Sequence, residues 1–219
     1  ETTLGNNMLV ASVGVDLGIT ARDDSGVESM RVNGAELYQR GSSEDITYSQ
    51  QLRYAEGTHE VTIEATDLSD KVTSQKLQVT VDLTAPIMGI REPEDALVTQ
   101  EAQIRLAGTA ADQHGVASIS LDGAVIAQSQ GDNQLPFATD LALKDGENSF
   151  IVVAKDIAGN ENYTAIKVFK GDRQSSAAML WYVAERSPES LKMASLSPAD
   201  LVAILESVRA QDAAAGVQI

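Results

Sequence analysis

The fold is decided by a stretch that occurs twice, as "LGITARDDSGVESMRVNGAEL" over residues 17–37 and as "LAGTAADQHGVASISLDGAVI" over residues 106–126. The two copies align without a gap, and Gly26 and Gly115 are 89 positions apart. The residues that match are alternating apolar positions and turn formers, which are the parts that a duplicated framework retains. The sequence therefore predicts two copies of one domain.

Apolar residues recur at every second position within each copy. The run from Val13 to Ala21 alternates apolar with polar or small residues, and the runs Val61–Ala65 and Leu77–Val81 do the same. A period of two predicts strands with one buried face. The stretch "FIVVAKD" (150–156) is apolar on both faces, which is typical of a central strand.

Tight turns are expected between these strands. Asn33-Gly34 and Asp122-Gly123 suit two-residue hairpins in which both central residues have positive φ. Frequent turns between short strands indicate a sandwich or a barrel. The glycines expected to shape these turns are Gly26, Gly34, Gly57, Gly115, Gly123, Gly146 and Gly159.

The segment "VDLTAP" (81–86) marks a boundary between the two copies, because Pro86 ends a strand ladder and Asp82 favours a turn. We therefore expect one domain over residues 1–82 and a second over residues 83–171.

These features resemble the bacterial immunoglobulin-like repeats of secreted and surface proteins, including the module similar to the glucodextranase B domain. The resemblance covers about residues 5–171 and is carried by "VDLTAP", by Tyr48 and Phe137, and by "LALKDGENSFIVVAKDIAGN" (141–160). It implies tandem antiparallel β-sandwiches in a bacterial protein outside the cytoplasm, where such modules serve as spacers, adhesin stalks or accessory modules of enzymes.

A third segment, residues 172–219, is predicted to be helical, because strand periodicity stops and Ala, Leu, Met and Glu dominate. The expected fold class is therefore mainly β, with two sandwiches followed by a small α-helical C-terminal unit. Its apolar stripe could pack on the second sandwich, pair within the segment, or dock on another chain and form a homo-oligomer. The residues of this possible docking helix are Trp181, Leu201, Ile204, Leu205 and Val208.

Composition excludes several partners. A formal charge of -16 in 219 residues opposes binding to a phosphate backbone, and no apolar run is long enough to span a membrane. The absence of cysteine removes disulfides and thiolate chemistry.

The turn "DIAGN" (156–160) has two readings. Asp156 can accept backbone N–H groups while Gly159 and Asn160 close a hairpin, which makes the motif a structural turn. Alternatively, Asp156 and Asn160 could bind calcium together with Asp82 and Asp112. The structural reading is favoured, because no "DxDxDG" spacing accompanies the motif.

Catalytic residues are not expected. The two histidines, His59 and His114, have no "GxSxG" serine to serve, and the adjacent Asp23-Asp24 is typical of turn caps. We expect no cofactor other than calcium.

The sequence thus predicts a non-catalytic extracytoplasmic module that presents a neighbouring domain or contacts other proteins or cell-surface components. The alternatives are an accessory ligand- or carbohydrate-binding module of a secreted enzyme, for which the polar stretch "YQRGSSEDITYSQQ" (38–51) is the place to look, and a calcium-stiffened adhesin segment.

Overall fold

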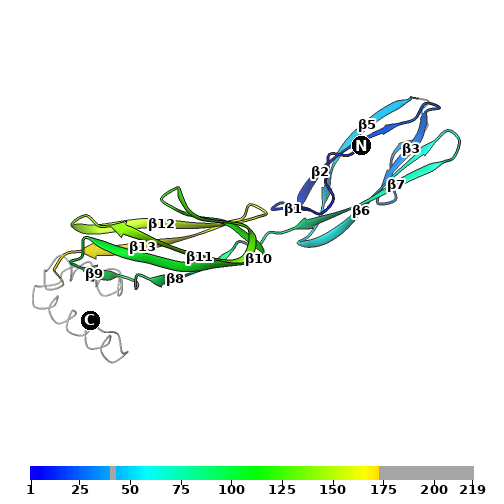
Figure 1. The fold of residues 1–219 in the computed structure, drawn as a ribbon. Coiled ribbons are helices and arrows are strands. Elements are labelled where there is room, and N and C mark those ends of the chain that lie inside the picture. The colour runs from blue at the N-terminus through cyan, green and yellow to red at the C-terminus, as the bar shows by residue number, and fades with distance from the viewer. Residues whose placement is uncertain (40–42, 173–219) are drawn as a thin grey trace, which may run out of the picture. The chain divides into compact units, whose positions relative to one another are not determined.

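A computed structural model describes residues 1–39 and 43–172, and all regular structure in this part of the chain is β-strand (Figure 1). This corrects the expected fold class: the described chain is all β, because the two-residue alternation continues through its last strand, and no helix occurs in it. Apart from residue 172, the segment predicted to be helical lies outside the described residues, and so do Trp181, Leu201, Ile204, Leu205 and Val208. None of the described residues forms a helix that could cross a membrane.

The chain forms two compact units. Unit 1 holds Glu1–Pro86 together with Gln113–Gly115 and Lys155–Glu161 from the second half of the sequence. Unit 2 holds Ile87–Asp112, Val116–Ala154 and the described residues from Asn162 onward.

Unit 1 contains a five-stranded sheet in the order β1-β7-β6-β3-β4 and a two-stranded sheet, β2-β5. The strands of the larger sheet are β1 (Met8–Val10), β3 (Val27–Val32), β4 (Ala35–Gln39), β6 (Gly57–Asp67) and β7 (Val72–Val81). In the smaller sheet, β2 (Gly14–Arg22) and β5 (Asp45–Arg53) run antiparallel over their full length.

The core of unit 1 lies between these two sheets. Val15, Leu17 and Ile19 alternate along β2 and are buried against Val61 of β6 and Val79 of β7. Burying such a side chain contributes about 1.5–3 kcal/mol. The alternating pattern read from the sequence therefore supplies one apolar face to each layer of a sandwich.

Unit 2 is built on a sheet in the order β11-β10-β12-β13-β9, with β8 paired to β10 outside that path. The strands are β8 (Ile87–Glu92), β9 (Leu97–Thr99), β10 (Gln103–Leu121), β11 (Ala124–Ala142), β12 (Gly146–Asp156) and β13 (Glu161–Lys170). The register of β10 with β11 shifts between Ala111 and Val116, where an irregularity breaks these long strands. Leu106 and Ile119, from the two halves of β10, belong to one buried core.

The two repeats share strand register as well as sequence. Met8 of β1 pairs in parallel with Val79 of β7, and Leu97 of β9 pairs in parallel with Val168 of β13. Both members of the second pair are displaced by 89 positions from the first. By the same shift, β10 covers the positions of both β2 and β3. The tandem repeat predicted from the sequence is therefore confirmed at the level of strand pairing.

Candidate functional site

Four of the five buried polar side chains among the described residues, those of Asp67, Asp82, Asn148 and Asp156, accept or donate hydrogen bonds at turns. The Oδ1 atom of Asp67, a buried residue at the end of β6, accepts hydrogen bonds from the N–H groups of Ser69 (2.7 Å) and Lys71 (2.9 Å). In unit 2, the buried Asn148 binds the N–H and the carbonyl of Lys144 through its amide. Where the backbone leaves the sheet, its N–H groups no longer pair with a neighbouring strand, and these side chains accept their hydrogen bonds instead.

The "DIAGN" turn follows the same plan with an additional bond. The Oδ1 atom of Asp156 accepts from the N–H groups of Gly159 and Asn160, and its Oδ2 atom accepts from Nδ2 of Asn160 at 2.8 Å. Asp156 is 1% exposed, and Gly159 has a φ of 110°. This carboxylate therefore acts as the centre of a closed hydrogen-bonded turn.

The N–H of Leu68 donates to the carbonyl of Gly26, and at the repeat-equivalent positions the N–H of Ile157 donates to the carbonyl of Gly115. These two bonds occupy the same place in the two repeats. They anchor the turn of Asp67 to the turn at Gly26, and the turn of Asp156 to the turn at Gly115.

A second pair of equivalent bonds holds the two hairpins. Oδ1 of Asn33 accepts from the N–H of Thr62 (2.9 Å), and Oδ1 of Asp122 accepts from the N–H of Ile151 (2.8 Å). Asn33 and Asp122 have φ values of 51° and 47°, and the glycine after each also has a positive φ, which a type I′ turn requires.

Asn160 departs from its counterpart in the first repeat, which is Lys71. Its Nδ2 atom donates to the backbone carbonyl of Asp82 at 2.9 Å and lies 3.4 Å from the carbonyl of Thr84. Asp82 is 1% exposed, and its Oδ1 atom accepts from the N–H of Thr84 at 3.1 Å. Asn160 therefore restrains the segment that connects the repeats. Asp82, Thr84, Asp156 and Asn160 all belong to unit 1.

His114 completes this network from the residues of β10 that belong to unit 1. Its Nδ1 atom lies 2.9 Å from Oδ2 of Asp82, and its side chain is 30% exposed. A proton on Nδ1 makes this contact a hydrogen bond, and without that proton the buried Oδ2 would have no hydrogen-bond partner. Asp82 and His114 could supply a carboxylate oxygen and an imidazole nitrogen to a cation, and Asp112 precedes His114 by two residues.

Of the four calcium candidates, Asp82, Asp156 and Asn160 are brought together in unit 1, and Asp112 lies half-buried in β10. Each of the seven glycines expected to shape turns has a positive φ. Sequence reasoning did not find the bond from Asn160 to Asp82 or the contact of His114 with Asp82. Both join residues far apart in the chain, and no local motif announces them.

His59 and Asp23, two of the residues considered for catalysis, contact neighbouring residues of unit 1. His59 stacks on Tyr54 with ring centroids 4.5 Å apart, and its Nε2 atom lies 2.7 Å from the carbonyl oxygen of Ala55. Asp23 accepts hydrogen bonds from the side chain and the N–H of Ser25, and these bonds lower the pKa of its carboxyl below 3.8. A carboxylate held in this way caps a turn.

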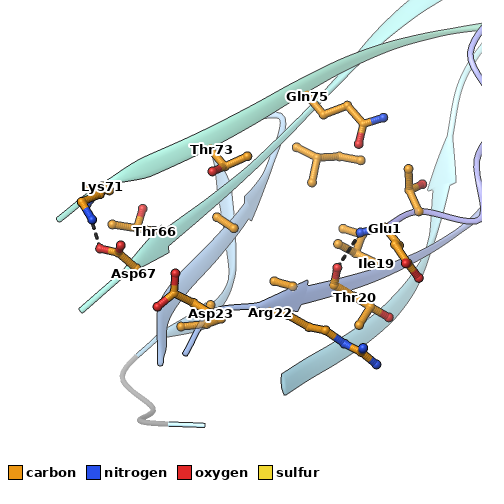
Figure 2. Close-up of a pocket in the computed structure, with 15 residues that line it drawn as sticks. Glu1, Ile19, Thr20, Arg22, Asp23, Thr66, Asp67, Lys71, Thr73 and Gln75 are labelled. Carbon is orange, nitrogen blue, oxygen red and sulfur yellow. Dashed lines mark hydrogen bonds between the residues drawn. The ribbon is translucent and has the colours of Figure 1, made fainter. Parts of the chain in front are cut away.

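Unit 1 also has an open cleft of about 350 Å³ between its two sheets (Figure 2). Ile19, Thr20 and Arg22 of β2 lie on one side of it, and Thr73 and Gln75 of β7 lie on the other. The buried Val27 and Ile63 contribute apolar surface, and Asp23, Asp67 and Lys71 contribute charged groups. The cleft has the volume of a small ligand site.

Aromatic side chains divide into packed and exposed groups. Tyr38, Tyr48 and Tyr54 pack against the core of unit 1, and Phe137 is buried in the core of unit 2. Tyr163 on β13 is 75% exposed. The sequence does not reveal this exposure, because alternation places Tyr163 in a strand without showing which face is covered.

Comparison with protein families identifies the second repeat. Residues 86–170 match the family model described as "Glucodextranase, domain B". Together with the repeated strand register, this match confirms the recognition of the chain as tandem immunoglobulin-like β-sandwich repeats. No curated protein sequence matches the chain.

Solved structures with similar chains include the fibronectin(III)-like modules of Clostridium thermocellum CbhA, at 16% identity and a TM-score of 0.46, with 80% of this chain and 97% of that chain covered. The Bacteroides ovatus mixed-linkage glucan utilization locus protein SGBP-B, solved with a mixed-linkage heptasaccharide, is similar at 17% identity and a TM-score of 0.22, over 74% of this chain and 42% of that chain. The titin domains z1z2 in complex with telethonin are similar at 14% identity and a TM-score of 0.27, over 78% of this chain and 96% of that chain.

Proposed function

We propose that this chain is a non-catalytic extracytoplasmic module that spaces or presents a neighbouring domain, with domain boundaries near residues 82 and 171. The observation that carries this proposal is the use of the buried polar side chains. Asp67, Asp82, Asn148 and Asp156 each bind the backbone of a turn, so their hydrogen-bonding capacity serves the fold.

The bond from Asn160 to the carbonyl of Asp82 supports the spacer role in particular. A spacer transmits position only if its connecting segments are held, and this bond restrains the segment at residues 82–84. The resemblance of the repeats to modules of secreted and surface proteins of bacteria supports a location outside the cytoplasm.

The test is mechanical. The full chain is held by its two ends and stretched in optical tweezers. We expect two separate unfolding steps, each releasing on the order of 270 Å, about 3.4 Å for each of roughly 80 residues. Asn160→Lys should lower the force of one step, and the exposed-site variant Glu147→Ala should leave both unchanged. Gradual extension at low force without steps would contradict the spacer proposal.

A second candidate function, carbohydrate binding, is favoured by one observation, the exposed ring of Tyr163 on a sheet face. Aromatic faces stack on sugar rings, and the aliphatic Ile151 of neighbouring β12 is also exposed. Titration with a soluble mixed-linkage glucan should perturb the Tyr163 ring signals if this function is correct. Tyr163→Ala should remove the accompanying response of the Ile151 methyl groups on neighbouring β12, and Tyr54→Phe, at a packed ring, should keep it.

A further inference from the structure

Asp82 carries a buried carboxylate oxygen that the turns of unit 1 do not use. Its Oδ1 atom accepts a hydrogen bond from the N–H of Thr84, and its backbone carbonyl accepts one from Nδ2 of Asn160. Among the described residues, no group donates a hydrogen bond to Oδ2 unless Nδ1 of His114 carries a proton. Because Asp82 is 1% exposed, solvent does little to offset the negative charge on this oxygen.

His114 places a ligand atom beside this oxygen. Its Nδ1 atom lies 2.9 Å from Oδ2 of Asp82, and its side chain is 30% exposed, so solvent reaches the pair from the side of the imidazole. An imidazole whose proton is on Nε2 has a lone pair on Nδ1. A lone pair and a carboxylate oxygen at this distance repel each other unless a proton or a metal ion lies between them.

The spacing of the two atoms suits a metal ion. Zn²⁺ binds imidazole nitrogen and carboxylate oxygen at about 2.0–2.2 Å, which places two such ligand atoms about 2.8–3.5 Å apart, for angles between a right angle and the tetrahedral angle. The separation of Nδ1 and Oδ2 lies in this range. The donor types also select the metal, because an imidazole nitrogen suits zinc and similar transition metals, whereas calcium takes oxygen ligands.

The repeated framework does not require this pair of residues. The shift of 89 positions relates His114 to Ser25 and Asp82 to Gly171. In the first repeat, Ser25 donates hydrogen bonds to Asp23 within a turn of its own. The sandwich therefore forms with serine in place of the histidine, and the pair of Asp82 and His114 is available for another role.

We propose that Asp82 and His114 of unit 1 form a binding site for Zn²⁺, which Oδ2 of Asp82 and Nδ1 of His114 ligate together with water. Asp112, two residues before His114, adds a further carboxylate to β10, and the acidic composition of the chain favours cation binding. The ion would restrain the segment at residues 82–84 in addition to the bond from Asn160. The site does not depend on the spacer role, so either proposal can fail alone.

The probe is Zn²⁺ alone, titrated into the full chain and followed by NMR of the isotope-labelled imidazole nitrogens. We expect saturable binding of one ion per chain, with a change at Nδ1 of His114 and no change at the nitrogens of His59. The melting temperature should rise with Zn²⁺, because an ion that binds the folded chain stabilises it. The same concentration of Ca²⁺ or Mg²⁺ should leave the melting temperature unchanged.

Two substitutions test the ligands. His114→Ser introduces the residue that the first repeat has at this position, and Asp82→Asn retains an oxygen that can accept from the N–H of Thr84. Each should weaken zinc binding by about tenfold or more, since loss of even an outer partner of a metal ligand typically costs about 10–100-fold. The control His59→Ser removes the other histidine of the chain and should leave the affinity unchanged. Amide spectra without zinc establish that each variant is folded, and if one is unfolded the other carries the test.

Three results would overturn the proposal. They are the absence of any change at His114 in millimolar Zn²⁺, binding of the ion through Nε2 with the proton on Nδ1, and an affinity that either folded variant retains. The second result would make Asp82 an acceptor that orients the imidazole. The third would place the ion on ligands other than this pair.

Discussion

Asp156 has almost no contact with solvent, and its two carboxylate oxygens are used by three donors. Asp67 holds the equivalent turn in the first repeat with two donors. The difference comes from the residue four positions later, which is Asn160 in one case and Lys71 in the other. A single amide side chain therefore distinguishes a turn that only closes itself from one that also restrains a remote segment.

Replacing Asp156 by alanine should lower the free energy of unfolding by about 1–3 kcal/mol, because buried N–H donors lose their acceptor. Urea denaturation monitored at amides of unit 1 measures the loss. Glu147→Ala, an exposed change on the same strand, should stay within about 0.5 kcal/mol. Equal effects of the two variants would show that the turn contributes nothing specific.

Asn160→Lys gives the second repeat the side chain of the first. The N–H that bonds to Asp156 is retained, and the side-chain bonds to Asp156 and to the carbonyls of Asp82 and Thr84 are lost. We expect a smaller loss than for Asp156→Ala, with increased hydrogen exchange at Thr84. An unchanged exchange rate at Thr84 would show that the side chain of Asn160 does not restrain the segment at residues 82–84.

Calcium is expected to leave the melting temperature unchanged, because the oxygens of Asp156 already accept hydrogen bonds from N–H groups. Differential scanning calorimetry with millimolar calcium and with chelator tests this. A rise with calcium that is absent in Asp156→Ala would instead support the calcium hypothesis stated from the sequence.

At the scale of elements, β6 and β7 are joined by an exposed ion pair whose pH dependence can be stated. Nζ of Lys76 lies 2.8 Å from Oε1 of Glu60, and this hydrogen bond lowers the pKa of Glu60 below 4.5 and raises the pKa of Lys76 above 10.5. The stabilisation is therefore present above pH 4.5 and is lost as the pH falls through the lowered pKa. On the alkaline side it is present below pH 10.5 and is lost as the pH rises through the raised pKa.

The Lys76→Met variant should raise the pKa of Glu60 toward 4.5, as measured by NMR titration of its carboxyl group. The matched variant Lys155→Met breaks the remote pair with Glu161 and should leave Glu60 unchanged. The effect on stability should be small in both, because exposed ion pairs contribute little. An unshifted Glu60 in Lys76→Met would show that the pair does not persist in solution.

Elements with a local signal were predictable from the sequence. Alternation located β2, β6 and β7, and the Asn-Gly and Asp-Gly pairs located two hairpins, because these features depend on neighbours in the chain. The bond from Asn160 to Asp82 joins residues 78 positions apart, and the cleft of unit 1 is lined by residues of β2, β6 and β7, which are far apart in the chain. Such features require the folded arrangement of strands. The predicted fold class was wrong in adding a helical unit, since the described chain is all β.

At the scale of the whole molecule, unit 1 is not a continuous piece of sequence, because Gln113–Gly115 and Lys155–Glu161 belong to it. A fragment of residues 1–86 should therefore be less stable than unit 1 in the full chain. Urea denaturation followed at Val79 in both molecules measures the difference. Equal midpoints would mean that the contacts of Asn160 and His114 with Asp82 do not stabilise unit 1.

The parallel pairing of β1 with β7 also constrains when the protein can fold during synthesis. Met8 meets Val79, so the ribosome must release nearly the whole first repeat before β1 has a partner. Pairing of this kind closes a long loop and is slow. A nascent chain paused before Val72 would expose the edge of β6 that pairs with β7 in the complete fold. We expect this unpaired edge to be the first part of the paused chain to aggregate in the cell.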